Sequence, residues 1–207
     1  NDLNSWRNYG KCESNFISNR NITKDEWNFI TGKEAEIFTK LQMIPDRLRD
    51  IAENIFQGLV TSSDSVYLLE PVSYPDDTCI RVRSKATDKE YLLERDIIWP
   101  LCKGSRDIRR YIAVPSKVVL FPYNTNSPVT SKKSLLISEN EFITNYPNTW
   151  AYLYENSMTL KNREKGKMKH DGWYGYVYPK SISLFAKKKI ITPSIASSAS
   201  FAYDHNG

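Results

Sequence analysis

A chain of 207 residues, of which 40% are hydrophobic and 26% charged, has the composition of a folded protein, and this excludes general disorder. No apolar run approaches the roughly 20 residues of a membrane span, so no membrane partner is expected. The three cysteines, Cys12, Cys79 and Cys102, are widely spaced and odd in number, which argues against both a disulfide framework and a zinc knuckle. We therefore expect a reducing, cytoplasmic location.

The net charge of +5 is unevenly distributed along the chain. Residues 160–189 contain nine basic and two acidic side chains, a net charge of +7, and residues 103–117 contain five basic and one acidic, a net charge of +4. The rest of the chain is therefore acidic, at −6. A lysine run is often only solvated surface, but two basic segments in an otherwise acidic chain favour one face that binds a polyanion.

Residues 23–58 are predicted to be helical. Thr23, followed by two acidic residues, is typical of a helix cap, and apolar residues then follow at helical spacing with an interruption near Gly32. Pro45 is typical of the first turn of a second, amphipathic helix, which we expect to end at Gly58.

Short apolar or alternating runs indicate that residues 59–137 and 172–207 are mainly β. Between them, residues 138–168 are predicted to be helical, because Ser138 begins a capping-box pattern, with a break at Pro147. Helices and strands come in blocks, so we expect an α+β fold with N-terminal helices, a mixed β-sheet and a helical segment inserted between strands. The expected strands are residues 66–69, 79–82, 91–93, 118–121, 174–178, 182–185 and 190–195.

The sequence lacks the patterns of several common catalytic sites. No two glycines stand in a G-x-G pair, which a loop for a nucleotide-type cofactor needs for close backbone approach. No acidic residue has a lysine two positions later, the pattern of the commonest restriction nucleases, and the only histidines, His170 and His205, are far apart. We therefore expect no catalytic residue, no metal and no cofactor in this chain.

Several stretches, taken in order, resemble the TaqI-like specificity domain at the C-terminal end of adenine-N6 DNA methyltransferases and of fused restriction-methylation enzymes. Residues 55–67 (IFQGLVTSSDSVY) resemble that family's glycine, threonine, aspartate and strand entry. Residues 99–111 (WPLCKGSRDIRRY) are similar to its lysine-glycine and aspartate-isoleucine segment, with one extra residue before the aspartate. With KIITP at 189–193 and FAYD at 201–204, the resemblance covers roughly residues 27–207.

The resemblance implies that residues 1–207 form a single DNA target-recognition domain of a type II restriction-modification system. A catalytic adenine-specific methyltransferase domain, with its S-adenosylmethionine pocket, would lie N-terminal to residue 1 or in a partner subunit. This chain would then hold double-stranded DNA while that domain methylates an adenine flipped out of the stack. Whether a restriction endonuclease is also fused stays open.

Three segments supply the residues expected to contact DNA. The small polar side chains of residues 57–64 suit contacts to phosphates or base edges, although a helix end and a turn cap are the alternative. The arginines of residues 106–110 are expected on one helical turn, where they grip phosphate or read guanine, with structural ion pairs as the alternative. The basic link 163–170 leads into aromatic residues that suit either stacking or a half-buried strand. The candidate DNA-binding residues are Gln57, Thr61, Ser62, Arg106, Arg109, Arg110, Arg163, Lys165, Lys167, Lys169, Trp173 and Tyr174.

Three alternatives remain open at this stage. The chain could be a separate specificity module of a multi-subunit restriction system. It could be a non-catalytic protein-interaction domain, which predicts an exposed apolar patch and no salt-dependent affinity for DNA. It could also be an enzyme of another type, for which a cleft with shifted carboxylate pKa values would be the sign.

Overall fold

The computed structural model describes residues 2–10, 17, 22, 29–30, 33–125 and 135–207 of the chain. The chain divides into two compact units, residues 1–55 and residues 56–207, and each is described by itself. The described elements of the first unit are three helices: α1 (Asp2–Tyr9), α2 (Lys33–Gln42) and α3 (Leu48–Ile51).

The predicted long helix from Pro45 to Gly58 is wrong. The helix α3 covers four residues only, and its C-cap residue, Ala52, has extended backbone angles (φ −90°, ψ 121°). Neither α2 nor α3 contains a buried residue, and a short helix that buries no apolar face gains little stability from packing. The amphipathic pattern therefore does not extend the helix to Gly58. The predicted cap at Thr23 lies outside the described residues.

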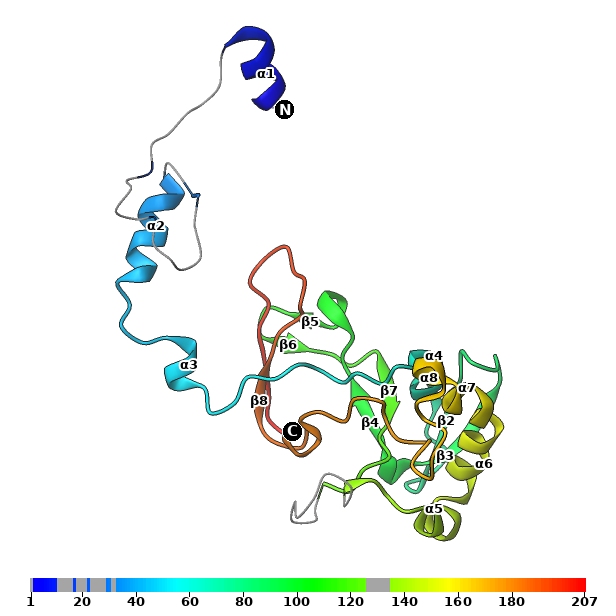
Figure 1. The fold of residues 1–207 in the computed structure, drawn as a ribbon. Helices are drawn as coiled ribbons and strands as arrows, with labels where there is room; N and C mark the ends of the chain where they lie inside the picture. Colours follow the sequence, from blue (N-terminus) through cyan, green and yellow to red (C-terminus); the bar gives the residue numbers. More distant parts are fainter. Residues whose placement is uncertain (1, 11–16, 18–21, 23–28, 31–32, 126–134) are drawn as a thin grey trace. The chain divides into compact units, whose positions relative to one another are not determined.

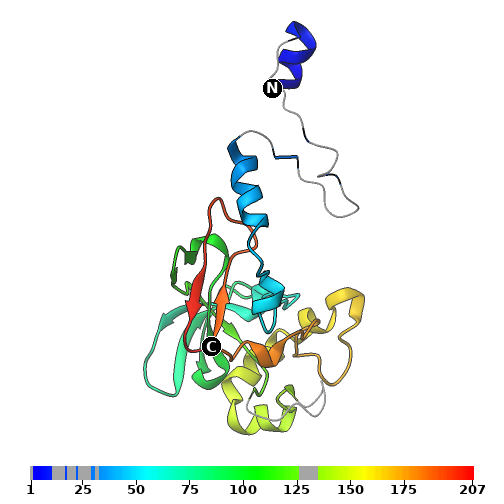
Figure 2. The ribbon, with the colours of Figure 1, turned by 90° about the vertical axis from the view of Figure 1, so that its left-hand side faces the viewer.

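The second unit is built on a five-stranded sheet in which every neighbouring pair is antiparallel, with the order β3-β2-β1-β7-β4 (Figures 1 and 2). Two small hairpins add two-stranded sheets, and β6 of the first contacts β9 of the second. The α+β fold predicted from the sequence is confirmed. The sheet strands are β1 (Leu68–Ser73), β2 (Cys79–Arg83), β3 (Glu90–Glu94), β4 (Ile98–Leu101) and β7 (Lys117–Leu120); the hairpins are β5 (Ile108–Arg109) with β6 (Ile112–Ala113), and β8 (Lys189–Ile191) with β9 (Ala202–Asp204).

The expected helical segment 138–168 is confirmed, with its break at Pro147. Ser138 caps the first helix, because its side-chain oxygen accepts a hydrogen bond from the Glu141 backbone nitrogen at 3.3 Å. Pro147 occupies the first turn of the next helix, where its missing N–H costs nothing. The helices are α5 (Glu139–Asn145), α6 (Pro147–Glu155), α7 (Ser157–Lys161) and α8 (Arg163–Gly166).

Three of the seven expected strands, at 79–82, 91–93 and 118–121, are confirmed as β2, β3 and β7. The others are partly or wholly wrong. Residues 64–67 form the short helix α4 (Asp64–Tyr67) ahead of β1, and Ile182–Leu184 form a 3-10 turn. Residues 174–178 form no strand: they lie in a series of turns and bends, from which Tyr174 and Tyr176 pack into the core while Tyr178 is exposed. Strand β8 stops at Ile191, four residues before the expected end.

The core lies between the sheet and the helical segment and is rich in aromatic residues. Tyr67, Phe121, Phe142 and Tyr152 are among its largest fully buried side chains. Two of the buried tyrosine hydroxyls donate to main-chain carbonyls: that of Tyr67 to Tyr174 O at 2.8 Å, and that of Tyr152 to Val66 O at 2.7 Å. Burial raises the pKa of both hydroxyls, so they stay protonated donors. Among the described residues, no buried side-chain polar atom lacks a hydrogen-bond partner.

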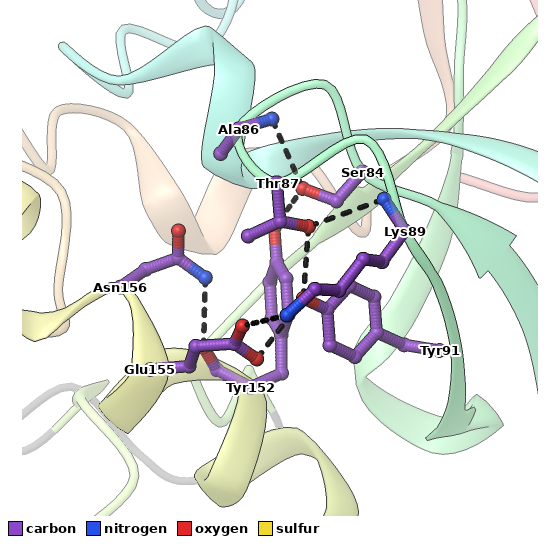
Figure 3. Close-up of polar contacts among 8 residues, drawn as sticks. All are labelled: Ser84, Ala86, Thr87, Lys89, Tyr91, Tyr152, Glu155 and Asn156. Carbon is purple, nitrogen blue, oxygen red and sulfur yellow. Dashed lines mark hydrogen bonds and ion pairs between the residues drawn. The ribbon is translucent and has the colours of Figure 1, made fainter.

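A polar cluster fastens α6 to strand β3 and to the turn between β2 and β3 (Figure 3). The Lys89 ammonium lies 2.8 Å from one carboxylate oxygen of Glu155, and the Tyr91 hydroxyl donates to the other at 3.0 Å. In the same cluster the Ser84 and Tyr152 hydroxyls share a hydrogen bond of 2.8 Å. The Tyr152 hydroxyl donates its own proton to the Val66 carbonyl, so in the bond between the two hydroxyls Ser84 is the donor and Tyr152 the acceptor. The cluster therefore has a structural role.

Candidate nucleic-acid interface

The loop Thr61–Asp64 contacts both basic segments that the sequence singled out. The Thr61 hydroxyl donates to the Asp64 carboxylate at 2.8 Å and accepts from the Ser63 backbone nitrogen at 3.1 Å, which fixes the loop internally. The Lys103 ammonium lies 3.0 Å from the Asp64 carboxylate, and an Arg163 N–H donates to the Thr61 carbonyl at 2.9 Å. Segments near residues 61, 103 and 163 therefore meet at this loop.

The electrostatics of Asp64 fit this junction. Partial burial acts to raise the pKa of its carboxyl, but hydrogen bonds from Lys103 and Thr61, together with the Lys103 charge, hold that pKa below its usual value. The carboxylate is therefore charged at neutral pH and forms an ion pair with the Lys103 ammonium. The sequence placed Lys103 in the basic segment 103–117 but not among the candidate DNA-binding residues, and only the fold brings it to Asp64.

The predicted role of Arg163 is not supported by its position, because its guanidinium lies inside the protein. Only 7% of the residue is exposed. Its nitrogens donate to the carbonyl oxygens of Leu160 at 2.8 Å, Thr61 at 2.9 Å, Trp173 at 2.6 Å and Gly175 at 2.8 Å. The group also lies 5.4 Å above the ring of Tyr67. Arg163 thus holds three segments together, and its donors are directed at buried carbonyls instead of phosphate.

Three other candidates also lie in the interior. Thr61 is 1% exposed, and Trp173 and Tyr174 are buried members of the aromatic core. The Tyr174 hydroxyl donates to the Ile137 carbonyl at 2.8 Å. The alternative that these aromatics pack in the core is therefore the one that the structure supports, although they form turns instead of a strand.

Lys165, Lys167 and Lys169 are exposed and form a basic ridge directly after the buried arginine. The chain turns sharply here, because Glu164, Lys165 and Gly166 have consecutive positive φ angles of 48°, 60° and 86°. None of the three ammonium groups pairs with a carboxylate of the described residues. Lys167 lies 5.3 Å above the ring of Tyr178. The ridge leaves three cations available to a polyanion.

The arginines of the second basic segment do not share one helical turn, contrary to the prediction. Arg106 lies in a 3-10 turn (Gly104–Arg106), Arg109 lies in strand β5, and Arg110 lies in the turn after β5. The positive φ of Gly104 (69°) ends the extended chain, and the hairpin then diverts the backbone from a helical path. All three arginines are exposed, and none forms an ion pair with a described carboxylate.

The base of this hairpin is fastened by Asp107, which is 5% exposed. Its carboxylate accepts hydrogen bonds from the Lys103 backbone nitrogen at 2.7 Å and from the Ser116 hydroxyl at 2.7 Å. Burial acts to raise the pKa of Asp107, but these hydrogen bonds and the charge of Arg106 lower it below its usual value. The hairpin therefore projects its arginines from a fixed base.

The remaining candidates lie on the loop before α4. Gln57 is exposed, and Ser62 is half-buried with a positive φ of 56°. Gly58 does not end a helix, since the nearest preceding helix ends at Ile51. Asp64 is the first residue of α4, where an acidic side chain is favourable.

One hollow was not foreseen from the sequence. A cavity of about 690 Å³ lies between α6, α7 and the turn that follows the basic ridge, and it includes Lys169. The Lys161 ammonium lies 5.1 Å above the ring of Trp173 in its wall. The cavity could not be predicted from the helical segment alone, because its lining also includes residues 169–171 and Trp173 from the turn after α8. Its other lining residues are Glu139, Trp150, Tyr154, Met158, Asn162, His170 and Asp171.

A scan against models of protein families finds no family that matches this chain, and a search of curated proteins finds no relative. The resemblance to the TaqI-like specificity domain therefore rests on the quoted residues alone and stays a prediction. Across the part of the chain that the structure describes, no helix is long and apolar enough to cross a bilayer. Those same residues contain no group of three or more potential metal ligands.

Proposed function

We propose that this chain recognises double-stranded DNA as the target-recognition part of an adenine-specific DNA methyltransferase of a restriction-modification system. The observation that carries the proposal is the junction at Thr61–Asp64, because it joins three segments whose residue patterns each indicate a DNA-facing role. Two of these segments carry exposed cations without carboxylate partners among the described residues.

Phosphate binding is assigned to the basic ridge. A lysine ammonium is a compact point charge that neutralises phosphate without reading sequence. Base reading is assigned to Arg109 and Arg110, because a guanidinium on a fixed hairpin can donate two hydrogen bonds to guanine in the major groove. Arg163 and the aromatic core are assigned a structural role, without contact to DNA.

The methyl transfer itself is assigned to a catalytic partner. A methyltransferase domain with S-adenosylmethionine, in the same polypeptide or in a separate subunit, receives the flipped adenine, and this chain supplies the grip on the duplex. The expected setting is the cytoplasm, in keeping with the free thiols of Cys79 and Cys102.

Binding of a labelled duplex, measured by fluorescence anisotropy over a series of salt concentrations, tests the proposal. The triple variant Lys165→Glu, Lys167→Glu and Lys169→Glu should bind more weakly. The slope of log K against log salt should also become shallower, by about 0.9 for each phosphate that the variant no longer neutralises. A control with the same change in charge is Lys33→Glu, Lys40→Glu and Lys85→Glu, whose lysines are exposed on other segments.

Equal losses of affinity in both triple variants would mean that only net charge matters, and the assigned ridge would be wrong. Selection from a randomised duplex library on the same chain tests sequence recognition. An enriched motif with an invariant adenine supports the methyltransferase assignment. A chain that retains no duplex at any salt concentration overturns the proposed function.

A further inference from the structure

The tip of the β5–β6 hairpin holds an aromatic residue in an uncommon backbone conformation. Tyr111 has a φ of 67°, in the left-handed region, and 79% of its surface is exposed. A bulky residue is disfavoured there, because its Cβ crowds the following carbonyl, and glycine or asparagine is the usual occupant. The exposed ring gains no burial to offset this cost. Such strain is retained where the surrounding structure fixes it, and it gathers at functional sites.

The surrounding structure does fix this tip. The Tyr111 backbone nitrogen donates to the carbonyl of Phe201 at 2.7 Å, so the segment before β9 holds the turn from the side. The Val114 backbone nitrogen donates to the Asp107 carbonyl at 2.9 Å, and the Asp107 carboxylate fastens the base of the hairpin. Figure 2 shows the two hairpins beside each other, the first green and the second orange to red. The ring is therefore presented by a preorganised backbone.

The chemistry of the tip suits a nucleic acid. The Arg110 guanidinium lies 5.9 Å from the centre of the Tyr111 ring, and Arg109 precedes it on β5. Residues 108–116 contain these two arginines and no acidic residue, so the tip is cationic as well as aromatic. An exposed ring offers a stacking face to a base, while flanking guanidinium groups meet phosphate or base edges.

A comparison with a second exposed tyrosine, Tyr74, shows which features are particular to Tyr111. Tyr74, in the turn after β1, is 58% exposed and has the Arg95 guanidinium 5.5 Å from its ring centre. That turn is acidic, because Asp76 and Asp77 follow, and Asp77 lies 4.0 Å from Arg95. Tyr74 is not among the residues with positive φ. An arginine beside a tyrosine thus occurs at both places, but the strain and the cationic surround are features of Tyr111 and not of Tyr74.

We propose that Tyr111 contacts the bases of bound DNA, its ring stacking against a base or entering between two base pairs, beside the bases that Arg109 and Arg110 contact. This inference rests on the proposed function. Apolar side chains that enter a base step unstack it and hold the duplex in a bent form. Nearby exposed side chains, Ile112 and Tyr203, would widen the contact.

The test combines duplex affinity with the fluorescence of 2-aminopurine placed in turn at positions of the enriched site. Unstacking by the wild-type chain should raise the fluorescence at one step. Tyr111→Ala should lose about tenfold in affinity, within the range for removal of a stacked aromatic, and should abolish the fluorescence change. Tyr111→Phe should retain both, and Tyr74→Ala, the matched control, should behave as wild type.

Thermal unfolding separates this role from a structural one. Tyr111→Gly should raise the melting temperature, because glycine accepts a positive φ at no steric cost, and it should still lose affinity. If Tyr111→Ala binds as tightly as wild type with the same fluorescence change, the inference is wrong while the proposed function stands. If the wild-type chain binds no duplex, the proposed function fails and takes the inference with it.

Discussion

Two regions of the second unit are stabilised in different ways. In the body, formed by the five-stranded sheet with α5–α7, large aromatic side chains are buried and their hydroxyls are bonded to carbonyls. In the lobe, formed by the hairpins β5–β6 and β8–β9, many large side chains are exposed. The lobe is held by backbone hydrogen bonds and by two carboxylates, Asp107 and Asp204, the second of which lies 2.6 Å from the Lys189 ammonium.

The difference separates the residues that stabilise the fold from those free to bind. A buried side chain in the body cannot change without loss of packing or of a satisfied buried hydrogen bond. An exposed side chain on the lobe, apart from these two carboxylates, can change while the backbone hydrogen bonds persist. Variants in the body should therefore alter stability first, and variants on the lobe or the basic ridge should alter binding first.

The largest expected effect on stability comes from Arg163. The variant Arg163→Ala loses the donors to four buried carbonyls and leaves a cavity above the ring of Tyr67. Its free energy of unfolding should therefore be lower than that of wild type by about 3 kcal/mol or more. Urea unfolding measures the loss. Lys165→Ala, two residues later on the exposed ridge, should change the free energy of unfolding by no more than about 0.5 kcal/mol. Similar losses in the two variants would break the division between body and surface.

A smaller effect within the body is expected for Tyr152→Phe. The variant keeps the ring but removes the hydroxyl that donates to Val66 O and accepts from Ser84, so it should cost about 1–2 kcal/mol. Tyr154→Phe, on the same helix with 64% of the residue exposed, is the matched control and should be close to neutral. Both are measured by urea unfolding, and an equally neutral Tyr152→Phe would show that the buried hydroxyl contributes nothing.

The sequence predicted the helical segment well because its signals are local. Ser138 and Pro147 act within one turn of their own helix, and both positions were foreseen correctly. The α+β fold also followed from the order of the blocks. The helix expected up to Gly58 failed because periodicity cannot show whether a buried face exists.

At the candidate site, the sequence did not predict which basic side chains are buried and which are exposed. Arg163 and Lys165 look alike in a basic run, yet one is bonded to four carbonyls and the other is exposed. One of the carbonyls that Arg163 bonds, that of Thr61, lies 102 residues away along the chain. Likewise Tyr111 stood at the end of a quoted motif, but its positive φ and exposure follow from the hairpin and from Phe201.

The smallest expected effect lies in the lobe, at Asp107, and it depends on pH. Asp107→Asn keeps the shape of the side chain but replaces a charged acceptor of three hydrogen bonds by a neutral one, which should cost about 1 kcal/mol at pH 7. Because the folded pKa of Asp107 is lowered, its contribution is fully present above the unfolded value near 3.8 and is lost as pH falls through the folded pKa.

The difference in the free energy of unfolding between wild type and Asp107→Asn should therefore be constant from pH 7 to about pH 5 and close at lower pH, since the unfolded carboxyl titrates near 3.8. Urea midpoints at successive pH values measure it, with Asp77→Asn, a fully exposed change of the same kind, as the control. A gap that persists in strong acid would mean that the carboxylate is not what fastens the hairpin. The fixed presentation of Arg109 and Tyr111 would then need another cause, since the Asp107 carboxylate is what bonds to both ends of the segment 103–116.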